Sequence, residues 1–241
     1  MIVKSTEIKN NFGRYLKLLD KEIIIVTRNG NPVAKIEKYK DFDNFSEAKE
    51  ASGKYKAFNH IMTYKEFVEF SKNSEERYEY IDGEAYLLAS PGVTHQLVVG
   101  NLYAYLHAWF KGKECTPFIS PFDVMLKKDE NDINVVQPDI LVACDSQNKN
   151  EEDKYRGVPA LTIEVLSEST KSKDIIKKLE LYMQSGIKEY WIVDYFNKLV
   201  FAYEFENKDI KNIRSFAGED VLSSFAFDGL SIKLDDVFEN I

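Results

Sequence analysis

One glutamate stands in a segment that otherwise has the composition of a buried β-strand. Glu164 lies in the middle of the run Ala160–Leu166, whose other residues are apolar or β-branched. Such a run, without polar alternation, is typical of a strand covered on both faces. An ionised carboxylate buried there without a partner destabilises the fold or takes up a proton. The fold must therefore supply Glu164 with a cation, a metal ion or a hydrogen-bond network.

A second acid precedes another apolar run. Asp139 follows Pro138 within a segment, Val135–Ala143, that we expect to be one strand. Because alternate residues of a strand share a face, Asp139 and Glu164 can converge on one cation if their strands are neighbours. Mg²⁺ prefers oxygen ligands and takes one or two carboxylates together with waters and substrate phosphate. These two acids, followed by a lysine-bearing helix, indicate a metal-dependent phosphodiesterase.

The lysine-bearing helix is expected over Lys173–Gln184, ending at Gly186. Its apolar stripe leaves Lys178 on the shoulder, one turn before Tyr182. From that position the lysine can lean into a cleft at the sheet edge and orient a water or meet a phosphate.

Composition bounds the class of protein. The chain has 241 residues, 44% of them hydrophobic and 30% charged, which suits an ordinary globular protein of one or two domains. The net charge of −8 argues against a generally basic nucleic-acid-binding protein. Residues 1–60 nevertheless carry 12 Lys and Arg against 8 Asp and Glu, and the remainder carry 20 against 32. This asymmetry indicates two modules, the first of them basic.

The cysteines and the hydropathy of the chain indicate the cellular compartment in which the protein is expected. Cys115 and Cys144 lack metal-ligand spacing, and we interpret both as reduced thiols in the core. The chain begins without an apolar signal region, and no run approaches the roughly 20 apolar residues of a membrane span. We therefore expect a cytoplasmic protein.

The first forty residues have the pattern of a helix pair followed by a hairpin. Ser5 can cap the first helix, and apolar residues then recur at helical spacing as far as Leu19. Strands are expected over Glu22–Thr27 and Pro32–Glu37, joined by an Asn-Gly turn. A module of this size buries little core alone and usually needs a partner surface.

Three runs in this module carry a resemblance to a DNA-binding domain. They are Val3–Glu7, Asn11–Gly13 and Ile25–Gly30 leading into Pro32–Ala34. With them the module resembles the N-terminal domain of the Phd/YefM antitoxin family, which implies a homodimer that binds DNA. The implied DNA contacts are Lys4, Lys9, Asn10, Asn11 and Arg14. A dimerisation hairpin with solvated lysines is the alternative.

That family normally continues into a toxin-binding tail, whereas this chain continues into a second folded domain. A cognate toxin or antitoxin is therefore left open as a partner. We expect domains at 1–40 and 61–241, joined by a polar linker over 41–60.

The second domain has the pattern of a mixture of strands and helices. Thr63 and Glu66 have capping-box spacing at the start of a helix, and a long helix is expected over Gly92–Phe110. Strands are expected over residues 77–81, 84–89, 122–127, 135–143, 161–166, 189–193 and 200–206. This order predicts an α/β or α+β fold with a mixed central β-sheet flanked by helices.

Several motifs in residues 62–205 occur in the order and spacing of one nuclease family. They are Tyr78–Glu84, Ser90-Pro91 with His95, Gln137–Asp139, Pro159–Ser167, Asp174 with Lys178–Tyr182, and Gly186–Asp194. With these motifs the domain resembles the Uma-type endonucleases of the P-D-(D/E)-x-K superfamily. The resemblance implies a restriction-endonuclease-like core and a nuclease dependent on Mg²⁺, with Mn²⁺ as the alternative ion.

The resemblance also implies a set of site residues. The catalytic residues would be Asp139, Glu164 and Lys178, and the metal ligands Asp139, Glu164 and the backbone carbonyl of Val165. The accessory candidates are Glu79, His95 and Tyr182.

The superfamily pattern has its lysine two positions after the second acid, where this chain has Leu166. Lys178 is the matching position in this family.

Each site residue also has a structural interpretation. Glu164 and Lys178 can form a buried ion pair, and Lys178 alone suits the edge of an apolar helix face. The remaining structural interpretations are a turn residue for Asp139, an ion pair with Arg77 or a lysine for Glu79, a half-buried histidine for His95, and a core aromatic for Tyr182.

Two functions from different classes follow. The first is a metal-dependent nuclease acting on DNA and joined to an antitoxin-like DNA-binding and dimerisation module. The second is a DNA-binding regulator or antitoxin that carries a nuclease-like domain without cleaving. The displaced lysine and the acidic second domain favour the regulator to some extent.

Overall fold

The structure is a computed structural model that describes residues 1–8, 15, 18–19, 23–28, 31–36, 61–145, 155–167 and 174–241. The chain divides into two compact units, Met1–Ala51 and Ser52–Ile241. The expected linker over 41–60 and the expected DNA contacts Lys9, Asn10, Asn11 and Arg14 lie outside the described residues. The domain bounds near residues 40 and 61 therefore stay predictions.

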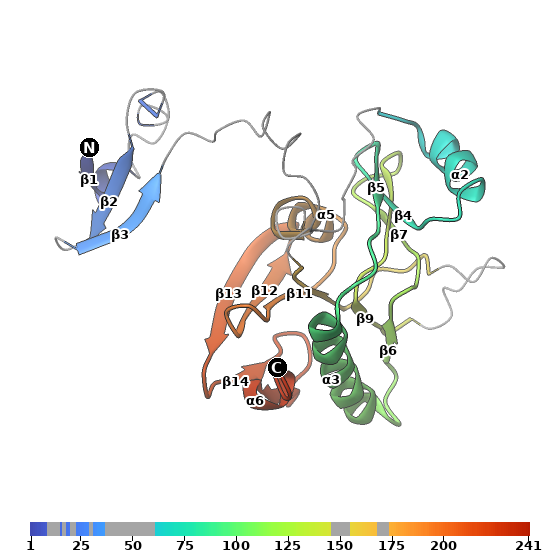
Figure 1. Ribbon diagram of the computed structural model, residues 1–241. Helices are drawn as coiled ribbons and strands as arrows, with labels where there is room; N and C mark the ends of the chain where they lie inside the picture. Colours follow the sequence, from blue (N-terminus) through green and yellow to red (C-terminus); the bar gives the residue numbers. More distant parts are fainter. Residues whose placement is uncertain are drawn as a thin grey trace. The chain divides into compact units, whose positions relative to one another are not determined.

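The N-terminal unit is built on a three-stranded sheet, with strand order β1-β2-β3 (Figure 1). Its strands are β1 (Ile2–Lys4), β2 (Ile24–Arg28) and β3 (Asn31–Ile36). β2 and β3 pair antiparallel, which confirms the predicted hairpin, and β1 pairs parallel to β2. Residues 5–8 are helical, whereas most of the expected second helix lies outside the described residues. Val3, Ile24 and Val26 belong to its small apolar core.

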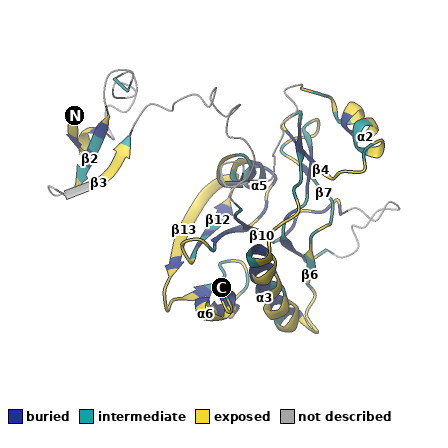
Figure 2. Ribbon diagram, viewed as in Figure 1, coloured by how far each residue is buried: buried dark blue, intermediate teal, exposed yellow. Residues whose placement is uncertain are grey.

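The larger unit contains the predicted mixed central sheet. Its strand order is β13-β12-β11-β10-β9-β6, in which β10 and β11 run parallel and the other neighbours antiparallel. The strands are β6 (Thr116–Ile119), β9 (Ile140–Ala143), β10 (Leu161–Val165), β11 (Glu189–Asp194), β12 (Leu199–Glu206) and β13 (Asp209–Ala217). Figure 2 shows β10 deeply buried and β13 mostly exposed.

A second sheet has the order β5-β4-β8-β7. Its strands are β4 (Tyr78–Ile81), β5 (Glu84–Leu87), β7 (Val124–Lys127) and β8 (Ile133–Val136). The helix α2 (Tyr64–Lys72) begins at Thr63, and the predicted capping box with Glu66 is present. The remaining elements are α3 (Val93–Phe110), η2 (Asp174–Lys178), α5 (Leu179–Gln184), β14 (Val221–Ser223), β15 (Ser231–Lys233) and α6 (Leu234–Val237).

Alternation along the central strands separates two cores. Ile163 and Val165 of β10 lie in a core with residues of α3 and the C-terminal elements. Leu166 lies in the other core, with Leu141 of β9 and Tyr182 of α5. Since alternate residues share a face, Glu164 projects toward the side covered by η2 and α5.

The expected single strand over Val135–Ala143 is wrong. The chain leaves β8 after Val136 and enters β9 at Ile140, so the two halves belong to different sheets. Pro138 has no N–H to donate to a ladder, which favours a break at this point. The interruption places Gln137 and Asp139 where the two sheets meet.

The expected helix over Lys173–Gln184 also differs in detail. Asp174–Lys178 form a π-helical turn, and the α-helix occupies only Leu179–Gln184. Gly186 ends the element in the left-handed conformation, with φ of 85°, as predicted. Lys173 lies outside the described residues.

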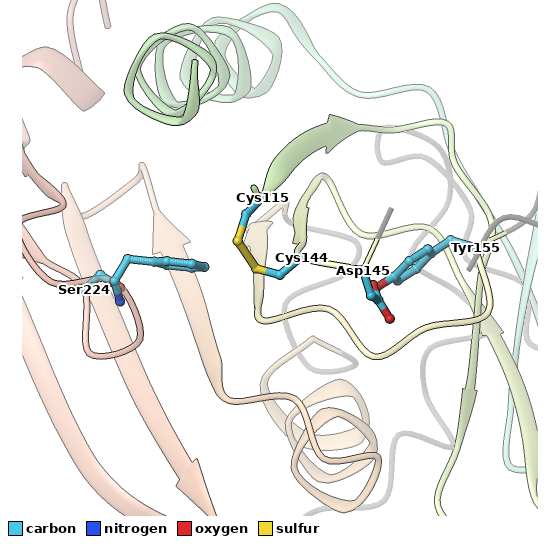
Figure 3. The surroundings of a disulfide bond; sticks show 6 residues. Cys115, Cys144, Asp145, Tyr155 and Ser224 are labelled. Carbon is cyan, nitrogen blue, oxygen red and sulfur yellow. A yellow bond between two sulfur atoms is a disulfide. The ribbon is translucent and has the colours of Figure 1, made fainter. Parts of the chain in front are cut away.

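The interpretation of both cysteines as reduced core thiols is wrong. Cys115 and Cys144 form a disulfide, and their Cα atoms are 4.0 Å apart (Figure 3). They lie at the paired ends of β6 and β9, where Thr116 is opposite Ala143. β6 was not expected from the sequence, and without it the proximity of the two cysteines cannot be seen. Among the described residues, no helix has the length and apolar character needed to cross a membrane.

Glu189 is a second buried acid of the central sheet, and its partners are those of a structural group. Its carboxylate accepts hydrogen bonds from Trp191 Nε1 at 2.6 Å and from Ser224 Oγ at 2.5 Å. It also accepts the main-chain N–H groups of Phe225 at 3.0 Å and Ala226 at 2.9 Å. Glu189 therefore fastens the loop after β14 to β11.

We predict that Glu189→Ala lowers the free energy of unfolding by about 3 kcal/mol or more, because each buried donor left unsatisfied costs roughly 1–3 kcal/mol. Urea denaturation followed by circular dichroism measures the change. Glu219→Ala, at an exposed position, is the control and should change stability little. Similar stability of the two variants would contradict the structural role of Glu189.

Candidate active site

The centre of the site is the ammonium group of Lys178, the last residue of the π-helical turn. Its Nζ lies 2.6 Å from Oε1 of Glu164 on β10 and 2.9 Å from Oε1 of Glu79 on β4. Lys178 is only 2% exposed, Glu164 4% and Glu79 0%. One buried cation thus connects an acid from each of the two sheets, which gives Glu164 the partner that its position requires.

Tyr182 completes this cluster from α5, one turn after Lys178. Its hydroxyl donates to Oε1 of Glu164 at 2.5 Å. Burial raises the pKa of Tyr182 well above its usual value, and the nearby Glu164 carboxylate raises it further. The phenol is therefore a proton-carrying donor at neutral pH.

Glu79 is also tied to the junction between the sheets. Its Oε1 accepts the main-chain N–H of Gln137 at 2.9 Å. The side chain of Gln137 donates onward to Oδ1 of Asp123 at 2.8 Å and accepts from Arg77 at 3.3 Å. Of the two expected structural partners of Glu79, the lysine is present as Lys178, and Arg77 is connected to Glu79 through Gln137.

Asp139 lies beside the cluster on the other side of the junction. Its Oδ2 accepts the main-chain N–H of Val165 at 2.8 Å and lies 3.2 Å from Nε2 of His95. The ladder between β9 and β10 reaches Ile140 opposite Ile163. Beyond that pair, the Asp139 carboxylate accepts the Val165 N–H in place of a main-chain carbonyl of a neighbouring strand. Asp139 thereby contacts the residue that follows Glu164.

The expected site residues therefore fall into two adjoining groups. One group contains Glu79, Glu164, Lys178 and Tyr182, and the other contains Asp139, His95 and Val165. Val165 contacts the site through its main-chain N–H, which donates to Asp139. The role of its carbonyl as a metal ligand stays a prediction.

Sequence reasoning missed a clamp that holds the π-helical turn from outside. Lys177 Nζ contacts both the carboxylate of Glu84 and the hydroxyl of Tyr86 on β5. Partial burial lowers the pKa of Lys177, but its bonds with Glu84 and Tyr86 outweigh burial and raise the pKa. Adjacent lysines thus bind neighbouring side chains on one face of the second sheet, because Glu79, the partner of Lys178, lies directly opposite Tyr86, the partner of Lys177. Glu84 belongs to one of the motifs found in the sequence. Its pairing with Lys177 could not be predicted, because nothing in the sequence indicated the π-helical turn that carries Lys177.

The oxygen donors at the junction suit a hard divalent cation. Among the residues that the structure describes, no three or more His, Cys, Asp or Glu side chains form a cluster able to hold a metal ion. Mg²⁺ does not require such a cluster, because one or two carboxylates with waters and phosphate oxygens complete its shell. Asp139 and Glu164, with the Val165 carbonyl, have the matching donor chemistry.

The fold of the larger unit is that of a nuclease-like α+β protein. It is shared with a crystal structure described as "a putative nuclease belonging to DUF820" from Anabaena variabilis. The TM-score is 0.60 at 20% identity, over 73% of this chain and 97% of that one. At this level of identity, the likeness shows the fold alone.

The chain belongs to the Uma2 family, described as "Putative restriction endonuclease", whose model matches residues 64–235. This confirms the predicted family. A relative in Synechocystis sp., the "Uncharacterized protein slr1290", is 23% identical over 181 residues, or 75% of this chain and 93% of its own length. Residues 1–53 match the model of the antitoxin Phd_YefM of type II toxin-antitoxin systems, which confirms the N-terminal resemblance.

We predict that Lys178→Met lowers the free energy of unfolding by roughly 3–5 kcal/mol, because it leaves two buried carboxylates without their shared cation. Lys177→Met is the matched control on the same turn. Its pair with Glu84 is partly exposed, so about 1 kcal/mol or less is expected. Urea denaturation compares the two variants, and equal losses would contradict the buried bridge.

Proposed function

We propose that this protein is a metal-dependent nuclease that hydrolyses phosphodiester bonds of DNA. The carrying observation is the buried pairing of Lys178 with Glu164, beside Asp139, in a chain of the Uma2 family. Buried ionisable groups that converge at one place are typical of active sites, although ion pairs that only stabilise a fold share this feature.

The position of Lys178 supports the proposal despite Leu166 in the usual lysine place. Its ammonium reaches Glu164 from the helix side, at 2.6 Å from Oε1. A lysine on another element can place its ammonium beside the same acid, at the position that the usual lysine would occupy. The π-helical turn supports this interpretation as well, since such turns occur frequently at functional sites.

In the proposed mechanism, Asp139 and Glu164, with the Val165 carbonyl, would hold Mg²⁺ or Mn²⁺. When bound, the ion would supply Lewis-acid stabilisation of negative charge on the phosphate. Lys178 would donate hydrogen bonds from Nζ to a phosphate oxygen or to the attacking water, and Glu79 would keep the ammonium oriented. Tyr182 would hold Glu164 in place through its hydroxyl.

A specific observation also favours the second function. Lys178 is 2% exposed and already lies within hydrogen-bond distance of two carboxylates. The same geometry would serve a bridge that only stabilises the fold. The alternative is a DNA-binding regulator or antitoxin whose nuclease-like domain does not cleave.

The N-terminal unit supports DNA as the partner in both functions. It matches an antitoxin model, and Lys4, one of the expected DNA-binding residues, is exposed on β1. The larger domain is acidic and would be repelled by phosphates. A basic, dimeric N-terminal module would offset this repulsion and bring the domain to DNA.

We predict cleavage of DNA with Mg²⁺ or Mn²⁺, and its loss when EDTA removes the metal. Asp139→Asn, Glu164→Gln and Lys178→Met should each lower the rate by at least about 100-fold. Gel assays with labelled substrates measure the rates, and Glu180→Gln, exposed on α5, is the control. Absence of cleavage of any DNA or RNA tested, with DNA binding intact, would instead support the regulator.

We further predict that Lys4→Ala, Lys9→Ala and Arg14→Ala weaken DNA binding and its dependence on salt. Each variant that removes one interaction with a phosphate should flatten the slope of log affinity against log salt by about 0.9. Fluorescence anisotropy at several salt concentrations measures the slope. Lys233→Ala, at an exposed position of the larger unit, is the control. Unchanged slopes in all three variants would refute the assignment.

A further inference from the structure

A pocket of about 210 Å³ lies between α2 and the end of the second sheet. Its lining includes Tyr64 and Phe67 of α2, Tyr78 of β4, and the polar residues Arg77, Asp123 and Gln137. Gln137 connects the pocket with the site, because its main-chain N–H donates to Glu79 at 2.9 Å. Tyr78 and Val135, which line the pocket, face α2, whereas Glu79 faces the other side of the sheet, so a bound ligand would be connected with the residues proposed for catalysis through Gln137.

A chain of hydrogen bonds fixes the polar side of the pocket. Arg77 Nη1 donates to Oε1 of Gln137 at 3.3 Å, and Gln137 Nε2 donates to Oδ1 of Asp123 at 2.8 Å. A guanidinium group has five N–H donors, and a carboxylate accepts several hydrogen bonds. The pocket thus presents a donor group at Arg77 and an acceptor group at Asp123, held apart by one amide.

The other side of the pocket is aromatic. Phe67 stacks on Tyr80, with ring centroids 4.8 Å apart and planes at 21°. Tyr78 packs edge-on against Phe70, with ring centroids 4.8 Å apart. These packing interactions hold the rings in place. Phe67 is only 4% exposed, so the partly exposed rings of Tyr64 and Tyr78 are those on which an unpaired base could stack.

Size and charge narrow the choice of ligand. The pocket is smaller than the range of about 300–1,000 Å³ typical of drug-sized ligands, so one planar ring system suits it. Its lining includes Lys72 and Arg77 but also Glu76 and Asp123. This balance of charge disfavours a free phosphate and favours a neutral ligand with both donor and acceptor edges.

We infer that this pocket binds one unpaired nucleobase of the nucleic-acid substrate, and that guanine matches it best. Arginine donates to O6 and N7 of guanine in the most common specific base interaction. The carboxylate of Asp123 would accept from the N1–H and amino groups on the other edge. The choice of a nucleic-acid ligand rests on the proposed function, but binding to the pocket does not require cleavage.

Binding of short single-stranded oligonucleotides to full-length Glu164→Gln protein tests the inference. The oligonucleotides alternate thymine with guanine, adenine or cytosine, and an all-thymine strand serves as reference. Fluorescence anisotropy should show the guanine strand binding about tenfold more tightly than the reference. The preference should disappear when Arg77→Ala or Asp123→Asn is added.

Two further variants separate base recognition from general charge. Arg77→Lys keeps the positive charge but loses the planar fork, so it should lose the guanine preference and retain binding of the thymine strand. Lys65→Ala removes an exposed charge from α2 outside the pocket lining and should leave the preference unchanged.

Equal affinity for all four strands, or a preference that survives Arg77→Ala, would overturn the inference. Neither result depends on nuclease activity. If the wild-type protein proves unable to cleave, the proposed function fails. The binding comparison still tests the base-binding pocket independently.

Discussion

The ammonium of Lys178 forms the interaction on which the larger domain depends. It binds Glu79 from one sheet and Glu164 from the other, and all three groups are buried. A buried charge is tolerated only when its partners lie close and the remaining hydrogen bonds are made. Gln137 supplies such a bond to Glu79, and Tyr182 supplies one to Glu164. The interaction that joins the two sheets and the interaction proposed for catalysis are the same.

The break between β8 and β9 organises the groups around this ammonium. On one side of Pro138, the main-chain N–H of Gln137 binds Glu79. On the other side, the carboxylate of Asp139 binds the main-chain N–H of Val165. In an uninterrupted strand, the main-chain N–H of Gln137 would belong to the ladder with a neighbouring strand. Because the chain changes sheets here, polar groups accumulate at a point surrounded by apolar cores, and the pocket that includes Gln137 opens beside them.

The sequence predicted those elements whose burial follows a regular period. The mixed sheet, the capping box at Thr63 and the need of Glu164 for a partner were all readable from local pattern. β13 was not, because its burial pattern is almost wholly exposed. The π-helical turn was missed since an assumed period of 3.6 residues leaves no place for it. The disulfide depends on pairing between β6 and β9, which is long-range information that neither strand carries alone.

The two buried glutamates of neighbouring strands show how a site differs from a structural anchor. Glu189 on β11 is held by the neutral donors of one loop and by the indole of Trp191. Those partners are dipoles fixed by the fold, and they suit a permanent carboxylate. Glu164 on β10 is held instead by an ammonium and a phenol from a short helical element. An ammonium on a separate helical element can also interact with a substrate, whereas the donors around Glu189 hold a loop on the sheet. Of these two acids in one sheet, only Glu164 has partners that could also serve a reaction.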